Sequence, residues 1–352
     1  MWFYIGIIVC ILTVYILFKN NIVIENFSIK VFVPNTVSEL LKKNDIVVDI
    51  DNKTLTRNGI VINLSKINSV DAVSNCVHKV TTSKMLNEQG IPTPTFIAYN
   101  NNMSVDTNVN IISNTLNFPM VAKPTSGYGG IAVHVDLNTA KELKNALQTI
   151  ISDESYKKII MKRRNKDDTT LMVENMVRGK NYRIIAYKDK IYSVIERQKP
   201  AVVGNGVHTL GELVDDRSKY TLKIYNHEFN KNNIDTEMIL KQNVTLDSII
   251  PKGKQIYLSN LISLNNGSLP LKIELDKIHP ENIRMFSSVN SILGTQITGI
   301  DFMTEDLMVP YYVDGHIMEV NSSPGLIYQC TIDPDNVIQL FNDMFDDAQK
   351  YQ

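Results

Sequence analysis

Short runs of hydrophobic residues alternate with polar stretches along most of this chain. The early runs IKVFV, IVVDI and GIVINL are separated by polar turns, a pattern typical of strands, and they predict a small leading lobe. The stretch SVDAVSNCVHKVTTSKMLNEQG then has helical apolar spacing at Val73, Val77, Val80 and Met85, and it ends in glycine with a proline soon after. These signals predict one helix over that stretch.

Strand and helix patterns continue to alternate after this helix. PMVAKPTSGYGGIAV predicts a strand, a glycine-rich loop and a second strand, and YRIIAYKDKIYSVIERQ predicts two strands joined by a tight turn. TAKELKNALQTII and IHPENIRMFSSVNSILG have helical spacing, the second with proline at its start. QITGIDFM and GHIMEVNSS predict two closing strands before an acidic amphipathic C-terminal helix.

The N-terminal run MWFYIGIIVCILTVYILF carries no charged side chain before Lys19. A helix of that length spans roughly 27 Å, enough for the hydrocarbon core of a bilayer. Neither a basic leading region nor a small-residue cleavage site is present, which favours a retained single-pass membrane anchor over a signal peptide. Lys19 and Lys30 follow the run, so the positive-inside rule places the body in the cytosol. A buried core element is the alternative.

Composition narrows the classes of partner. The 352 residues are 43% hydrophobic and 21% charged, which is enough for a sizeable core. With 36 Lys and Arg against 37 Asp and Glu, the net charge of -1 gives no electrostatic reason to expect nucleic acid. The cysteines Cys10, Cys76 and Cys330 are too far apart to indicate a metal site or a disulfide framework, so a reducing compartment is expected.

The glycine-rich loop has two interpretations. Gly127, Gly129 and Gly130 would let backbone N–H groups approach an anion, and Lys123 would put a cation beside them. The loop joins two predicted strands and no helix, which argues against a P-loop or a Rossmann turn. An ordinary hairpin is the alternative to an anion-binding flap.

The last predicted strand carries candidate metal ligands. Glu319 and Asn321 are two residues apart, so their side chains share one face while Val320 points to the core. Carboxylate and amide oxygens suit Mg²⁺, and Asp301, which we expect at the end of the preceding strand, could supply a third ligand. Polar residues at strand ends on the surface are the alternative.

Seven segments of this chain resemble the ATP-grasp ligases, in particular the ATP-grasp part of cyanophycin synthetases and bifunctional glutathione synthetases. The resemblance covers roughly residues 70–326 and implies an α+β ATP-grasp fold, in which two lobes clamp ATP. The segments are TSKMLNEQGIPTP, VAKPTSGYGG, VENMVRGKNYR, ERQKPAVVGNGVHTLGEL, IHPEN, GIDF and EVNSSPGL. The expected parts are a transmembrane anchor (1–19), a small N-terminal α/β lobe (20–90), a nucleotide-binding lobe (91–182), a lobe with the metal site (183–335) and a C-terminal helix (336–352).

The resemblance also implies roles for individual residues. ATP and two Mg²⁺ (or Mn²⁺) ions are the implied cofactors, with amino-acid-like or peptide substrates. The implied roles are Lys79 and Lys123 on the ATP phosphates; Ser126, Gly127, Gly129 and Gly130 in the flap; Glu174 and Val177 at the adenine; Asn181 at the ribose; Asp301, Glu319 and Asn321 on the metals; and Arg183 and Arg197 as catalytic residues facing the phosphate and acyl site.

The implied reaction joins a carboxylate to an amine through an acylphosphate, but this chain departs from the family in places. Asn181 stands where the family has an acidic residue, and Ser259, Leu261 and Ser263 stand where it has an arginine and asparagines. A non-catalytic ATP-binding module at a membrane is therefore one alternative, and phosphate transfer to another acceptor is a second. No Mur-ligase-like half follows the matched segments, so cyanophycin is not an expected product. The oligomeric state stays open, a homodimer included.

Overall fold

The computed structural model describes residues 35–127, 132–154, 170–225, 229, 232, 234–260, 262 and 267–350. In this part the chain forms two compact units: Thr95–Met176 make up the first, and the residues up to Pro94 and from Val177 onward make up the second. This division differs from the predicted lobes, because residues 37–64 share a hydrophobic core with residues 337–345 and belong to the second unit.

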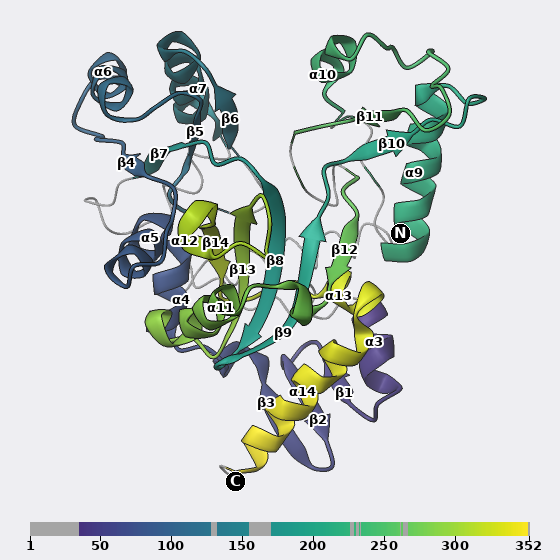
Figure 1. Cartoon of the computed structure of the whole chain (residues 1–352). Helices are drawn as coiled ribbons and strands as arrows, with labels where there is room; N and C mark the ends of the chain where they lie inside the picture. Colours follow the sequence, from purple (N-terminus) through teal and green to yellow (C-terminus); the bar gives the residue numbers. More distant parts are fainter. Residues whose placement is uncertain are drawn as a thin grey trace, which may run out of the picture. The chain divides into compact units, whose positions relative to one another are not determined.

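The first unit is an antiparallel sheet packed against two helices. Its strands, in the spatial order β4-β7-β5-β6, are β4 (Phe96–Ala98), β7 (Leu171–Asn175), β5 (Met120–Pro124) and β6 (His134–Leu137). Helices α6 (Val105–Thr115) and α7 (Ala140–Ser152) lie side by side and contribute Ile112 and Leu147 to the core (Figure 1). The hydroxyl oxygens of Ser104 and Thr139 cap these helices, which fixes where each one begins.

The second unit is built on a five-stranded antiparallel sheet. Its strands, in spatial order, are β12 (Pro270–Ile273), β9 (Lys190–Arg197), β8 (Lys180–Tyr187), β13 (Ile297–Thr304) and β14 (His316–Asn321). Helices α4 (Val70–Val77), α5 (Lys79–Glu88) and α11 (Pro280–Leu293) share one core with this sheet. The single helix predicted before Gly90 is wrong, because His78 adopts an extended conformation (ψ 98°) that separates α4 from α5.

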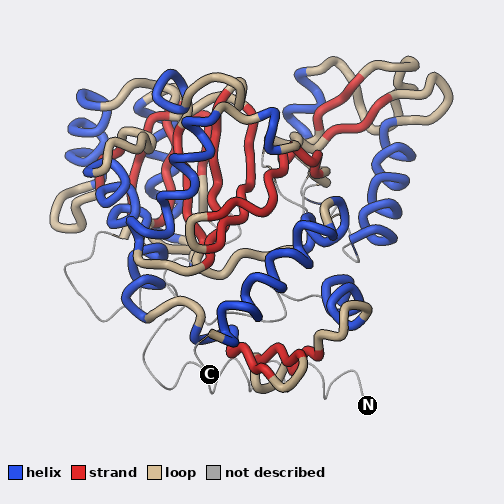
Figure 2. Tube along the Cα trace, turned by 60° about the horizontal axis from the view of Figure 1, so that its bottom comes forward, coloured by secondary structure: helices blue, strands red, loops and turns tan. Residues whose placement is uncertain are grey.

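The five-stranded sheet has a second face, opposite to the one that packs on α4, α5 and α11, and this face is apolar over only part of its area. Ile185, Tyr187 and Ile297 pack there against helices α3 and α14. Helix α14 also contacts the edge strand β3 of a small sheet, and Figure 2 shows the helix beside that sheet. The covering elements are α3 (Asn35–Lys42), β1 (Val47–Asp49), β2 (Thr54–Arg57), β3 (Ile60–Asn63), η1 (Leu64–Lys66), α13 (Ile327–Ile332) and α14 (Pro334–Gln349). The sequence predicted strands in this region but not the helix α3.

A further part of the second unit, between β9 and β12, has its own small core. Val202 and Ile256 lie opposite each other in a two-stranded ladder, and Leu210 and Ile239 pack on that side of it. The elements are β10 (Ala201–Val203), α9 (Leu210–Tyr225), α10 (Thr236–Lys241) and β11 (Gln255–Tyr257). The short elements η4 (Leu275–Lys277) and α12 (Tyr311–Asp314) lie elsewhere in this unit.

The pairing of β13 with β14 contains a bulge. Asp301 lies opposite Glu319, but the next residue, Phe302, lies opposite Ile317, so Met318 is an extra residue in β14. Bulges bend a strand and increase its twist locally, often next to functional sites. The bulge falls beside the residues predicted to bind metal.

The predicted membrane anchor, residues 1–19, lies outside the described part of the chain. Among the helices that the structure does describe, none is both long and apolar enough to cross a bilayer.

Candidate active site

Polar side chains occupy the end of the large sheet that α3 and α14 leave uncovered. Arg183, Asp301 and Glu319 lie directly opposite one another on β8, β13 and β14. Along β8 the same face carries Asn181 and Arg183 first and the core residue Ile185 next. The period of two along each strand therefore brings three of the predicted site residues into one row.

Asp301 is the centre of an ionic cluster. Its Oδ1 lies 3.1 Å from Arg183 Nη1, and its Oδ2 lies 2.8 Å from Arg197 Nη2. All three side chains are at most 16% exposed. Burial lowers the pKa of the Arg183 guanidinium, although the charge of Asp301 acts in the opposite direction. The two arginines thus offset the cost of burying one carboxylate.

Neighbouring backbone and amide groups fix the two arginines in place. Arg183 Nη1 donates a hydrogen bond to the carbonyl oxygen of Gly299 at 3.0 Å, and Arg197 Nε donates one to Asn181 Oδ1 at 2.7 Å. A Cβ atom on Gly299 would lie only 2.7 Å from Arg183 Nη1, so glycine is needed for this close approach. Asn181, predicted at the ribose, holds an arginine in this structure.

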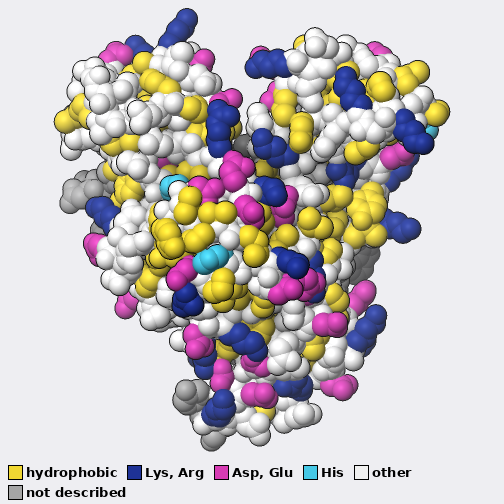
Figure 3. Space-filling model, in the orientation of Figure 1, with side chains coloured by type: hydrophobic (Ala, Val, Ile, Leu, Met, Phe, Trp, Pro, Cys, Tyr) yellow, Lys and Arg dark blue, Asp and Glu magenta, His cyan; other side chains and the backbone are white. Residues whose placement is uncertain are grey.

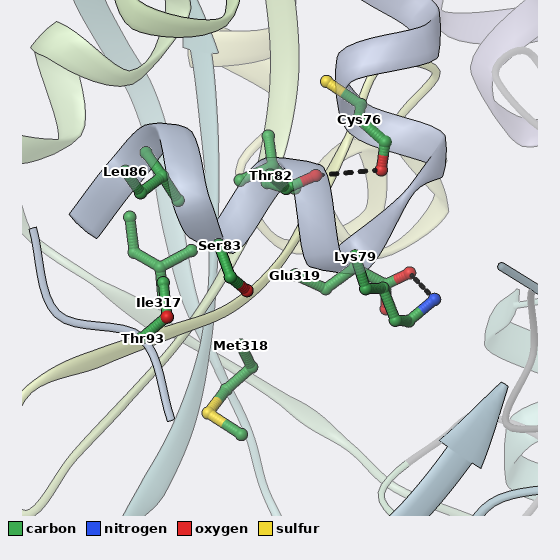
Figure 4. A pocket seen from close by; sticks show the side chains of 10 residues that line it. Cys76, Lys79, Thr82, Ser83, Leu86, Thr93, Ile317, Met318 and Glu319 are labelled. Carbon is green, nitrogen blue, oxygen red and sulfur yellow. Dashed lines mark hydrogen bonds and ion pairs between the residues drawn. The ribbon is translucent and has the colours of Figure 1, made fainter. Parts of the chain in front are cut away.

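Lys79 and Glu319 form the second ion pair of the site. Lys79 Nζ lies 3.1 Å from Glu319 Oε1, and Figure 4 shows the two side chains turned toward each other. Lys79 is the first residue of α5, because the helical run is interrupted at His78. The N-terminal end of a helix favours anions, and a lysine there adds a full positive charge.

Glu319 and Asn321 sit on β14 as the sequence predicted. Val320 between them is 2% exposed and packs in the core, so the residues on either side of it face the site. Asp301 lies in the middle of β13 and not at its end. Register with β8 and β14, and not strand length, is what places it in the row.

In the first unit, Lys123 and Glu174 form a buried ion pair. Lys123 Nζ lies 2.6 Å from Glu174 Oε1, and the two residues are 7% and 3% exposed. They come from the adjacent strands β5 and β7. Ser126, which follows β5, is buried as well. The residues predicted at the phosphates and at the adenine are thus in direct contact with each other here.

Some of the positions predicted from the sequence lie outside the part of the chain that the structure describes. Gly127 is the last described residue before the centre of the flap, so Gly129 and Gly130 lie outside the described residues, as do Leu261 and Ser263. Ser259 is 4% exposed. Val177 is half-buried between β7 and β8.

The donor set of the site fits a hard divalent cation. Asp301, Glu319 and Asn321 offer two carboxylates and an amide oxygen, the ligand types that Mg²⁺ and Mn²⁺ prefer. Asp301 Oδ1 is sealed from solvent, and apart from its ion pair with Arg183 it makes no hydrogen bond among the described residues. Such an atom has lone pairs left for a cation. No group of three or more His, Cys, Asp or Glu side chains suited to a metal occurs in that part of the chain.

Sequence reasoning did not predict the ion pairs. They join residues that are distant in the chain, and the strand order β9-β8-β13-β14 brings the two arginines to Asp301. The partner of Glu319, Lys79, comes from helix α5, and the pair of Lys123 and Glu174 comes from β5 and β7. The sequence analysis assigned Lys79 to the phosphates and the two arginines to the phosphate and acyl site, and it paired none of them with a carboxylate of the protein.

Comparison with known proteins identifies the fold. The chain is 31% identical over 270 residues to the cyanophycin synthetase of Crocosphaera subtropica, a match that covers 74% of this chain and 29% of that protein. It is 24% identical over 262 residues to the glutathione biosynthesis bifunctional protein GshAB of Streptococcus agalactiae, covering 72% of this chain and 33% of the relative. The structure matches a bifunctional glutathione synthetase from Pasteurella multocida with a TM-score of 0.56 at 19% identity, over 84% of this chain and 41% of the other. These matches confirm the resemblance to the ATP-grasp ligases.

The ATP-grasp fold predicted from the sequence is confirmed by the same comparison. This chain spans about a third of the length of these curated relatives. No family model matches the chain.

Proposed function

We propose that this protein is an ATP- and Mg²⁺-dependent ligase that joins a carboxylate to an amine. The observation that carries the proposal is the row of Arg183, Asp301 and Glu319 on three neighbouring strands. The row combines metal-binding oxygens with cations that suit phosphate and carboxylate groups. The names of the relatives, a synthetase and a glutathione biosynthesis protein, support the same class of reaction.

The proposed reaction has two steps. An oxygen of the substrate carboxylate attacks the γ-phosphorus of ATP, the bond to the β–γ bridging oxygen breaks, and ADP leaves with that electron pair. The amine then attacks the acylphosphate carbon; phosphate leaves with the electrons of the C–O bond, and the amine nitrogen loses a proton. No covalent bond to the protein is needed.

The residues of this chain would act by charge and position. In the first step two anions approach each other, so Arg183 and Arg197 would reduce their repulsion and stabilise the charge that develops on the transferred group. Lys79, at the N-terminal end of α5, would hold a phosphate group. Lys123 would also hold a phosphate group.

Asp301, Glu319 and Asn321 are the residues that would hold magnesium. When bound, a divalent cation neutralises phosphate oxygens and orients them. Mg²⁺ usually keeps several waters and takes further ligands from substrate phosphates, so three protein oxygens are sufficient.

Turnover of the full chain with ATP, Mg²⁺ and pooled amino acids tests the proposal. ADP release that depends on the amino acids, together with a new amide detected by mass spectrometry, is the expected result. Tight ATP binding without turnover in any pool would instead support a non-catalytic ATP-binding module. The buried Ser259, at a position where the resemblance implies a different polar residue, is the feature that favours this second candidate. Release of ADP with a phosphorylated product and no amide would indicate phosphate transfer to another acceptor.

The surroundings of the protein are also proposed. Basic and acidic side chains are interspersed on the face shown in Figure 3, which fits small anionic substrates better than a nucleic acid. We propose in addition that residues 1–19 attach the chain to a membrane, with the body in the cytosol. Fractionation of cells that express the full chain or residues 20–352 tests this, since only the full chain should sediment with membranes.

A further inference from the structure

A tyrosine that was not predicted at the site carries a buried hydroxyl. Tyr328 is in α13, the helix that follows the metal-binding strand β14. Its ring meets the ring of Tyr225 of α9 edge to face, with centroids 5.7 Å apart and an interplanar angle of 80°. Contact with a second aromatic ring fixes the position of the Tyr328 ring and therefore the direction of its hydroxyl.

The Tyr328 hydroxyl is buried and has no hydrogen-bond partner among the described residues. Burial raises the pKa of this hydroxyl, while the charges of Arg197 and Arg183 act in the opposite direction. The group therefore stays protonated at neutral pH and lies within the electrostatic reach of both arginines. An unpaired buried hydroxyl is costly, and such a group in a native structure calls for an explanation.

The two arginines also retain hydrogen-bonding capacity. A guanidinium has five N–H donors. The described contacts of Arg183, to Asp301 and Gly299, involve only Nη1. Those of Arg197, to Asn181 and Asp301, involve Nε and Nη2. Both arginines and the hydroxyl of Tyr328 thus have hydrogen-bonding capacity beyond their described contacts. The segment that leads into α13 reaches Arg183, because a Cβ atom on Gly299 would lie 2.7 Å from both Arg183 Nη1 and the Cβ of Pro324, four residues before Tyr328.

We propose that Tyr328 is a specificity-determining residue of the ligase, and that its hydroxyl donates a hydrogen bond to the carboxylate of the acid substrate held by Arg183 and Arg197. The inference rests on the proposed function and assigns the acid substrate to the α13 side of the arginines. A site built to donate such a bond discriminates strongly, because a ligand without the acceptor leaves the buried group unpaired.

The substitution Tyr328→Phe tests this role by removing only the hydroxyl and keeping the ring against Tyr225. The assay uses the acid that supports ADP release by the wild-type chain. In Tyr328→Phe the KM for this acid should rise roughly tenfold or more, because a hydrogen bond to a charged group is lost. The KM for ATP should stay within about twofold. Tyr182→Phe is the matched control, because Tyr182 is 3% exposed but packs in the core on the opposite face of the sheet. An unchanged KM for the acid in Tyr328→Phe would overturn the proposal.

A binding measurement keeps the test independent of turnover. The full chain, labelled with ¹³C at the tyrosine ring carbon that bears the hydroxyl, is titrated with acetate, L-aspartate and L-glutamate in the presence of Mg²⁺ and a non-hydrolysable ATP analogue. The resonance absent from Tyr328→Phe identifies Tyr328, and it should move with at least one carboxylate. If all three leave it unmoved, the proposal is wrong. A moving resonance without ADP release would argue against the ligase reaction and leave the carboxylate site in place.

Discussion

Lys79 Nζ lies 3.1 Å from Glu319 Oε1, so a side chain expected on a phosphate is paired with one expected on a metal ion. Asp301 is paired in the same way with Arg183 and Arg197. Each carboxylate of the site therefore has a basic partner before any substrate arrives. Binding of a metal–nucleotide complex would exchange these partners, because the carboxylates would turn to the cation and the basic side chains to the phosphates.

Glu319→Gln should abolish turnover without unfolding the protein. The amide keeps the size of the side chain but removes its charge, which weakens both the metal site and the pair with Lys79. The rate of ADP release should fall by about a hundredfold or more, which is the loss in rate that follows removal of one group that stabilises the transition state. Steady-state assays across a range of Mg²⁺ concentrations measure this rate. Glu274→Gln is the control, since that carboxylate is 64% exposed and pairs with Lys272, away from the site. Undiminished activity in Glu319→Gln would refute the metal assignment.

Gly299→Ala should displace Arg183. The added Cβ would lie 2.7 Å from Arg183 Nη1 and 2.7 Å from Pro324 Cβ, distances that the folded chain cannot accept unchanged. We expect a loss of about 1–3 kcal/mol in the free energy of unfolding, typical of overpacking, together with lower activity. Chemical denaturation and the ADP assay measure the two effects. In Gly211→Ala, the control, the new atom would lie 3.3 Å from the carbonyl oxygen of Leu246, a contact that a shift of a few tenths of an ångström relieves, so both quantities should change little.

Lys123→Met should destabilise the first unit by about 3–5 kcal/mol, because it leaves the carboxylate of Glu174 buried without its partner. Adding Glu174→Gln to the same chain should restore much of the loss, since the double variant has no buried charge at this place. The exposed pair of Lys144 and Asp106 is the control, and Lys144→Met should cost less than about 1 kcal/mol. Equal losses in the two lysine variants would show that burial of the Lys123 pair has no energetic consequence.

Asp347→Asn should weaken the attachment of α14 in a pH-dependent way. Hydrogen bonding to Lys188 is the main reason why the pKa of Asp347 is below its ordinary value of 3.8. A lowered folded-state pKa contributes stability that is present above pH 3.8 and is lost as the pH falls through the folded-state pKa. The variant should thus be less stable than wild type by about 1 kcal/mol at neutral pH, and the difference should vanish in acid.

Denaturation curves over this pH range measure that difference. Asp346→Asn is the control, because Asp346 is 68% exposed and lies 4.0 Å from its basic neighbour Arg57. A difference between Asp347→Asn and wild type that persists unchanged in acid would contradict the assignment.

The strand that carries the proposed metal ligands could be predicted from the sequence, and the contacts of its side chains could not. Alternation along β14 is a local property, so Glu319 and Asn321 could be placed on one face with Val320 on the other. Which cation meets which carboxylate depends on the order of strands in the sheet, and the sequence pattern does not contain that order. The position of Asp301 in the middle of its strand follows from the same register.

Helix boundaries show a second limit. Apolar spacing continues through residues 70–88, so the pattern predicts one helix, but His78 takes an extended conformation and begins a new one. Neither glycine nor proline marks this position. The helix α3 was missed because it is short and lies among strand-like runs. Tyr328 was missed because its relation to the arginines arises only when α13 packs beside the sheet.

The extra residue in β14 separates two properties of the proposed metal site: the identity of its oxygen ligands and the direction in which they point. Removing Met318 would give β13 and β14 a regular ladder in which Asp301 still faces Glu319, and Phe302 still faces Ile317. The same three oxygen ligands would remain on the same face, but the local twist that directs them would be lost. The alternation of side chains along β14 thus determines which atoms can bind an ion. The single inserted residue, Met318, determines the angle at which those atoms would approach the ion.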